Sequence, residues 1–222
     1  MHKSSLLGTT LATFALIGCS TVTQNAPSLP ATAPAAAAES NPLLAPWSGP
    51  YGGVPPWNEG TPERYRSALD AAIAMQAAEY EAIEKNAAAP TFDNTFLPMQ
   101  DSSRTLARVN AMFGVMTSNI NTPEYQALNK EVAPKLAAAR DKILLNERLF
   151  ARIQAVHAAR ASSGLTAEQT RLVERTYDLY RRSGAQLSAE DKKKLEDINQ
   201  QLASLFAEFS EKVLADENTW VV

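Results

Sequence analysis

The sequence predicts an all-α fold with about six helices between residues 61 and 222. From Thr61 onward, apolar residues recur at spacings of three and four, which places them on one face of a helix. No segment between residues 61 and 215 shows the apolar–polar alternation of a half-buried strand. The chain has 222 residues, of which 45% are hydrophobic, so it can bury a sizeable core.

Residues 1–18 have the features of a lipoprotein signal peptide. Lys3 precedes an apolar run from Leu6 to Ile17, which is shorter than the roughly 20 residues of a membrane-spanning helix. The run is followed by Cys19, the only cysteine of the chain. An export signal is therefore expected at this end of the chain.

The end of this segment resembles the lipobox of bacterial lipoproteins, in which the cysteine thiol takes a diacylglycerol. The residues that carry the resemblance are Leu16, Ile17, Gly18 and Cys19. We therefore expect lipidation at Cys19, export, and a lipid anchor in a bacterial membrane. By the same resemblance, Ser20 permits sorting to the outer membrane. The alternative is an ordinary cleaved signal, with a cysteine at this position by chance.

Two segments without regular structure are expected before the helices. Residues 19–40 are rich in Ala, Pro, Ser and Thr and cannot bury enough apolar surface to offset their ordering entropy, which predicts a tether. In residues 41–60, Pro and Gly exclude regular structure. That segment is nevertheless apolar, so we expect an irregular arm that packs its aromatic residues onto the helices. Its large apolar residues are Leu43, Leu44, Trp47, Tyr51 and Trp57.

The first helix is expected to begin at Thr61 as N-cap, with Pro62 at the first helical position, where its missing N–H costs nothing. Its apolar face comprises Tyr65, Leu69, Ile73, Tyr80 and Ile83. A second helix is expected to begin near Thr95, with Pro98 in its first turn. Its apolar stripe comprises Leu106, Val109, Phe113, Met116 and Ile120.

The third helix repeats the same opening, Thr122 followed by Pro123. Pro134 lies in its interior and is expected to kink or interrupt it, because proline removes one backbone hydrogen bond. The fourth helix is expected over residues 146–161, with Gly164 as a C-terminal cap.

The fifth helix is marked by Thr166 and Gln169, spaced as a capping box, and by Gly184 as its end. The sixth is expected to begin at Ser188 and to pack its apolar stripe, the strongest in the chain, against the other helices. This stripe comprises Leu195, Ile198, Leu202, Leu205 and Phe209. The final stretch "ADENTWVV" is expected to break this helix. Its last three residues are apolar and need a surface to pack against, so we expect a longer natural chain.

Few residues offer chemistry. A net charge of -3, without a basic stripe interleaved with aromatics, argues against nucleic-acid binding. His157 is the only histidine after the signal and is expected at the helix boundary or surface. Neither a His-Glu-x-x-His pair nor a glycine-rich phosphate loop occurs in the sequence. Neighbouring carboxylates, such as Glu79 with Glu81 or Glu190 with Asp191, are expected on solvated faces and caps. The basic run "DKKKLED" is likewise expected on solvated helix surface. No catalytic residue and no metal ligand are predicted.

Four stretches together resemble, in order and approximate spacing, the N-terminal region of the peptidyl-dipeptidases of the thimet oligopeptidase family of zinc metallopeptidases. These stretches are "NPLLAPWSGPYGGVPPW", "APTFDNT", "EVAPKLAAARDKILLNERLFARIQAV" and "NQQLASLFAEFSEKVLAD". The resemblance covers residues 41–222. Asp93 stands where glutamate is commoner and Trp57 where phenylalanine is commoner. Pro98 is a third departure, which bears only on where the following helix begins.

The resemblance implies a nearly all-helical, two-lobed enzyme around a deep channel, with zinc held at the channel floor by residues of the C-terminal half. Residues 61–222 would then be a helical N-terminal domain that forms part of the channel wall. The substrates of the whole enzyme would be short peptides, and the partner of this chain would be the absent catalytic half. The family's zinc ligands have no counterpart here, so we expect this chain alone to bind no catalytic zinc and to hydrolyse no peptide. The alternative is a self-contained helical binding or scaffolding lipoprotein without enzymatic activity.

Overall fold

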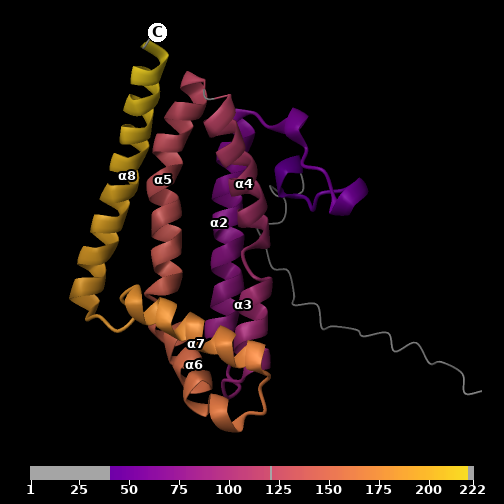
Figure 1. Cartoon of the computed structure of the whole chain (residues 1–222), viewed down its shortest axis with the longest axis vertical. Coiled ribbons are helices and arrows are strands. Elements are labelled where there is room, and N and C mark those ends of the chain that lie inside the picture. Colours follow the sequence, from indigo (N-terminus) through magenta and orange to yellow (C-terminus); the bar gives the residue numbers. More distant parts are fainter. Residues whose placement is uncertain (1–40, 121, 220–222) are drawn as a thin grey trace, which may run out of the picture. The chain divides into compact units, whose positions relative to one another are not determined.

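Helices make up most of the computed structural model, which describes residues 41–120 and 122–219 (Figure 1). Among these residues no strand occurs, only an isolated bridge between Ser48 and Val54. The predicted all-α fold is therefore confirmed. The long helices are α2 (Pro62–Glu84), α4 (Arg104–Asn119), α5 (Pro123–Leu144), α6 (Glu147–Ala159), α7 (Ala167–Arg182) and α8 (Ala189–Thr219). A short helix, α3 (Leu97–Asp101), precedes α4.

The predicted signal peptide (residues 1–18) and tether (residues 19–40) lie outside the described residues, as do the predicted lipobox and lipidation site. None of the described helices combines the length and the apolarity needed to cross a bilayer.

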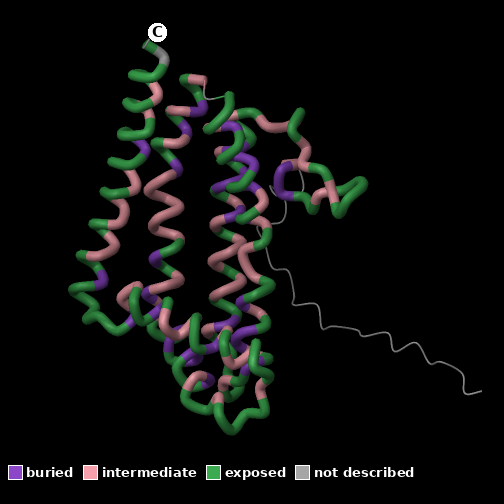
Figure 2. Tube along the Cα trace, in the orientation of Figure 1, coloured by how far each residue is buried: buried purple, intermediate pink, exposed green. Residues whose placement is uncertain are grey.

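The described helices pack around two hydrophobic clusters. In the first, α2, α4 and α5 pack against one another, and α8 lies along α5 (Figure 1). The second is formed by α6, α7, the end of α2 and residues 92–99. Fully buried members of the first include Tyr65, Leu69, Val109 and Leu128, and those of the second include Phe96, Leu149, Ile153 and Val173. Buried positions gather on these helices, whereas α8 has few of them (Figure 2).

Several predicted helix ends are confirmed by their capping geometry. The Thr61 hydroxyl accepts a hydrogen bond from the Arg64 N–H at 3.3 Å. Thr166 and Gln169 form both bonds of a capping box, at 3.2 and 2.9 Å. Gly184 follows α7 with φ +101°, a left-handed conformation that suits glycine. These ends depend on contacts within a few residues, which is why the sequence predicts them.

The predicted second helix is wrong in its start and in its continuity. The helical segment begins earlier, at a capping box formed by Thr91 and Asn94, and continues as a π-helical turn (η4, Phe92–Phe96) into α3. It then breaks at Ser103, which has φ +68°. Two side chains of α2 hold this break. Glu79 accepts the Ser103 N–H at 2.6 Å, and Gln76 donates to the Ser103 hydroxyl at 2.7 Å.

The sequence predicts a kink or an interruption of the third helix at Pro134. The interruption does not occur, because α5 runs without a break from Pro123 to Leu144. Proline removes one backbone hydrogen bond. Packing against α2 and α8 gives α5 tertiary support along its length, and such packing supplies most of the stability of helices in proteins. The last helix is also longer than predicted, since α8 continues to Thr219, and residues 220–222 lie outside the described residues.

The arm formed by residues 41–60 packs only in part as expected. Leu43 and Leu44 are buried in the first cluster, and Trp47 packs against it. Tyr51, however, is fully exposed, and Trp57 is 42% exposed. Tyr51 lies in the turn Pro50–Gly52 with φ +58°, at a position where its side chain meets solvent. The prediction that the aromatic residues pack onto the helices is therefore wrong for Tyr51 and only partly met by Trp57.

Candidate interaction surfaces

The single histidine of the described region lies in an aromatic stack. His157 is half-buried on α6, and its ring stacks on Tyr177 of α7 with centroids 4.0 Å apart. Tyr177 stacks in turn on Phe150, at 5.7 Å. Burial, followed by the charge of Arg160, lowers the pKa of His157. The ring thus has a packing role that agrees with the expected boundary position.

The described residues do not fit a catalytic zinc ion. Such a site needs about three protein ligands converging on one point, with a position left for water. Glu174 and Asp178 lie near His157, but no group of three His, Cys, Asp or Glu side chains in the described region could hold a metal ion. We therefore assign no metal-dependent step to these residues.

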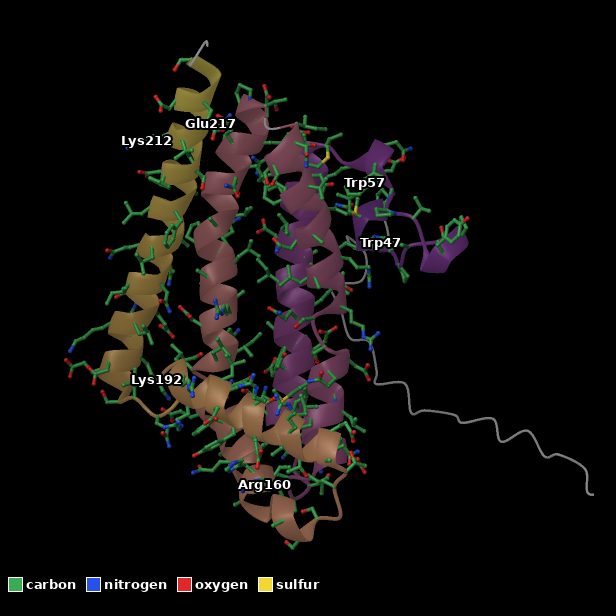
Figure 3. The ribbon with its side chains drawn as sticks, viewed as in Figure 1. Trp47, Trp57, Arg160, Lys192, Lys212 and Glu217 are labelled. Carbon is green, nitrogen blue, oxygen red and sulfur yellow. The ribbon has the colours of Figure 1, made fainter. Side chains whose placement is uncertain are left out.

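Of the charged residues expected on solvated faces and caps, Glu79 has a capping role, whereas Lys192 is buried, which contradicts the expectation. Glu79 is half-buried and caps the break at Ser103. Lys192 of the basic run "DKKKLED" is only 7% exposed, and its Nζ lies 2.9 Å from the carboxylate of Glu147. In Figure 3, Lys192 lies near the beginning of α8, where this helix meets the α6–α7 end of the structure. The neighbouring prediction of a cap is correct, since the Ser188 hydroxyl accepts the Asp191 N–H at 3.1 Å.

The stretch "APTFDNT" is held by a buried arginine. Arg152 of α6 is 6% exposed, and its Nη1 donates to the carbonyls of Asn86 (2.7 Å) and Ala88 (3.1 Å). Its Nη2 donates to the Asn94 Oδ1 at 2.8 Å. The same oxygen accepts the Thr91 N–H at 2.8 Å. This stretch therefore joins the turn after α2 to α6 and stabilises the fold, and its distinctive residues have no chemical role that the structure shows.

A depression of about 350 Å³ lies between α2, α3, α5 and α7. Its wall is mainly apolar, with a few polar groups from Gln76, Tyr80, Gln100 and Arg140. The Tyr80 hydroxyl is protonated at neutral pH and can donate a hydrogen bond, and burial raises its pKa further. Its apolar lining members are Met99, Leu106, Leu136, Ile143, Leu144, Leu179 and Tyr180, with Thr176 beside them. Such a mixture suits contact with an uncharged or weakly charged peptide segment.

The contact between α5 and α8 is mainly polar and lined by small residues. Asn199 donates to both carboxylate oxygens of Asp141, at 2.9 and 3.0 Å, and Lys130 forms an ion pair with Glu211. Ala207 is buried between these polar pairs. Asp141 is itself 5% exposed, and burial raises its pKa, although the bonds from Asn199 act in the opposite direction. The side of α8 that faces α5 is thus not its apolar side.

The apolar stripe of α8 faces solvent, which contradicts the predicted packing. Phe206 is 66% exposed, Phe209 is 65% exposed and Leu205 is 58% exposed. Only Leu195, near the start of the helix, is half-buried. We call the exposed set the apolar face of α8; it comprises Ile198, Leu202, Leu205, Phe206, Phe209 and Val213. The sequence identified the stripe but could not tell whether the described residues cover it.

Comparisons with known proteins relate this chain to peptidases. It is 38% identical over 176 residues to the dipeptidyl carboxypeptidase of Salmonella typhimurium, covering 79% of this chain and 26% of that protein. It is 36% identical over 175 residues to the dipeptidyl carboxypeptidase of Escherichia coli, with the same coverage. A probable cytosolic oligopeptidase A of Arabidopsis thaliana is 26% identical over 175 residues, 79% of this chain and 24% of that protein. No family model matches the chain. The chain spans about a quarter of the length of these relatives.

Proposed function

The chain matches a partial region of the dipeptidyl carboxypeptidases, members of the thimet oligopeptidase family, and we propose that it is a non-catalytic part of an exported zinc metallopeptidase that hydrolyses short peptides. The identity of 38% across 79% of this chain carries the proposal. The coverage of the relative, 26%, leaves most of such an enzyme outside the matched region.

In this proposal the described helices form part of the wall of a substrate channel. A wall of packed helices selects substrates by size and exposes side chains to the peptide without reacting with it. The depression between α2, α3, α5 and α7 supports this role, because it is mainly apolar and carries hydrogen-bonding groups from Gln76, Gln100 and Tyr80. Arg140, also in its lining, is exposed and could contact a carboxylate of a peptide.

Zinc and the chemical step belong, in the proposal, to a region of the enzyme outside this chain. When bound, zinc would activate a water molecule for attack on the peptide bond. The described residues contribute no ligand set for it. Their contribution is to position and select the peptide. Export and membrane attachment through Cys19 are the second part of the proposal, supported by the lipobox-like residues 16–19.

The test is to determine the genomic reading frame beyond codon 222 and to purify its complete product beside the 222-residue chain. We expect the frame to encode a His-Glu-x-x-His motif, and the complete product to contain zinc and to cleave a quenched oligopeptide until a chelator is added. The 222-residue chain should show neither zinc after dialysis nor cleavage. A stop codon directly after Val222 would contradict the proposal and favour a self-contained binding lipoprotein. Stoichiometric zinc in the 222-residue chain would contradict the assignment of the chemistry to another region.

A further inference from the structure

The apolar face of α8 forms one continuous surface. At 3.6 residues per turn, its six residues fall within an arc of roughly 100°, the width of the stripe by which a helix normally packs into a core. From Ile198 to Val213 the face is about 24 Å long at 1.5 Å per residue. Its central residues, Leu202, Leu205, Phe206 and Phe209, line an open hollow of about 440 Å³. Contiguous exposed apolar surface of this kind marks an interaction site in soluble proteins.

The described helices do not use this face for their own packing. Among the described helices, only α5 makes extensive contact with α8, and it meets the side of α8 that carries Asn199, Ala207 and Glu211. In Figure 1, α8 lies alongside α5 at the edge of the described helices. A 31-residue helix attached along one polar side leaves its apolar side free for another element.

The charge of α8 argues for a protein surface as the occupant rather than a lipid surface. The helix carries eight acidic residues and four lysines. An amphipathic helix that binds anionic lipid needs a polar face rich in Lys and Arg, so this helix is unsuited to that role. Lys212 and Glu217 both lie on the C-terminal half of α8 (Figure 3). This half carries four acidic residues and one lysine, so anionic lipid would repel it.

We propose that the apolar face of α8 docks onto an apolar helical surface in the region of the peptidase that this chain does not include; this inference rests on the proposed function. The matched relatives have about three-quarters of their length outside the matched region, which is ample chain to supply that surface. The docked element is an apolar helix stripe at least four turns long, matching the length of the face. It buries Phe206 and Phe209, the most exposed aromatic residues of α8.

The experiment compares one pair of substitutions in two proteins. The first is the 222-residue chain. The second is the Salmonella typhimurium dipeptidyl carboxypeptidase with its matched region replaced by residues 41–219 of this chain. The double variant Phe206→Ser with Phe209→Ser removes apolar surface from the centre of the face. The control, Gln201→Ser with Glu217→Ser, changes two exposed residues of α8 to the same side chain outside the face and outside the hollow.

If the face docks onto the rest of the enzyme, the phenylalanine variant lowers the Tm of the chimera by about 5 °C or more. In the 222-residue chain it changes the Tm by less than about 2 °C, and the control changes neither protein. An unchanged chimera Tm would overturn the proposal. A comparable loss in the 222-residue chain would also overturn it, because the face would then belong to the chain's own core.

Two further measurements are needed. Sedimentation tests whether a second copy of the chain occupies the face, and peptide cleavage by the chimera tests the proposed function independently of docking. Sedimentation of the 222-residue chain at micromolar concentration should show a monomer. A dimer that the phenylalanine variant abolishes would make a second copy the occupant and overturn the proposal. A chimera that shows the expected Tm pattern but cleaves no peptide contradicts the proposed function and supports docking. If the phenylalanine variant and the control variant of the chimera cleave peptide equally well and both keep the Tm of the unmutated chimera, the function is supported and docking is overturned.

Discussion

The substitution Asn94→Ala should destabilise the protein far more than the loss of one half-buried polar side chain suggests. The Asn94 Oδ1 accepts from the Thr91 N–H at 2.8 Å, from the Arg152 Nη2 at 2.8 Å and from the Thr95 hydroxyl at 3.0 Å. The Asn94 Nδ2 donates to the Ala89 carbonyl at 2.8 Å. Alanine removes all four bonds at once and leaves the buried guanidinium of Arg152 with one partner fewer.

The magnitude follows from the kinds of bond that are lost. A hydrogen bond to a charged group such as Arg152 contributes about 1.5–3 kcal/mol, and loss of a helix-capping bond costs about 0.5–2 kcal/mol. The other two bonds contribute about 0.5–1.5 kcal/mol each, although contributions within one network are not additive. We therefore expect a loss of about 3–5 kcal/mol, which corresponds to a Tm lower by roughly 6–20 °C for a domain of this size. The Arg152 Nε already has no hydrogen-bond partner among the described residues. Losing the bond from Nη2 to Asn94 would leave a second nitrogen of the buried guanidinium without that partner.

The assay is urea unfolding of the 222-residue chain, followed by circular dichroism at 222 nm. The dependence of the free energy of unfolding on urea concentration should be the same in all variants, which checks two-state behaviour. Asn110→Ala is the matched control, since Asn110 is exposed on α4. It should change the free energy of unfolding by less than about 0.5 kcal/mol. Asn94→Asp keeps the oxygens that accept from Thr91 and Arg152 and should cost less than Asn94→Ala. A loss below about 1 kcal/mol for Asn94→Ala would refute the argument that this residue joins the turn after α2 to α6.

Three further outcomes are expected. Cys19→Ser should release the exported protein from the membrane fraction, and mass spectrometry of the unmutated protein should find an acylated Cys19; an unmodified N-terminus further along the chain would contradict lipidation. Ile153→Ala, at a fully buried position, should cost about 2–5 kcal/mol, whereas Leu202→Ala should cost less than about 0.5 kcal/mol; equal costs in denaturant unfolding would show that Leu202 is covered. Burial raises the pKa of Asp141 in the folded state, so its ionisation lowers stability as the pH rises through that pKa. The stability of Asp141→Asn relative to the unmutated chain should therefore increase as the pH is raised from the pKa of an unfolded aspartate towards 7. An unchanged difference between the two proteins across that range would contradict the buried, pKa-raised state of the carboxyl.

The helix boundaries show what could be predicted from the sequence. Thr61, the Thr166–Gln169 pair and Gly184 act through their own backbone angles or through groups about three residues away, so their residue types suffice to place them. The break at Ser103 could not be predicted in this way. It depends on Glu79 and Gln76, which come from a helix more than twenty residues earlier in the chain.

By itself, the sequence determined the all-α class, most helix ends and a pattern that relates the chain to peptidases, because helical periodicity and capping are local properties. Only the tertiary structure decided which of the predicted apolar stripes are covered, since Leu69 and Val109 are buried as predicted but the stripe of α8 is not. In α8 the stripe of large apolar residues lies in solvent, while Asn199, Ala207 and Lys192 are turned towards the other helices. Periodicity gives the direction in which a helix can bury apolar surface. Whether that surface is covered depends on which other elements are present, and the sequence of one helix does not contain that information.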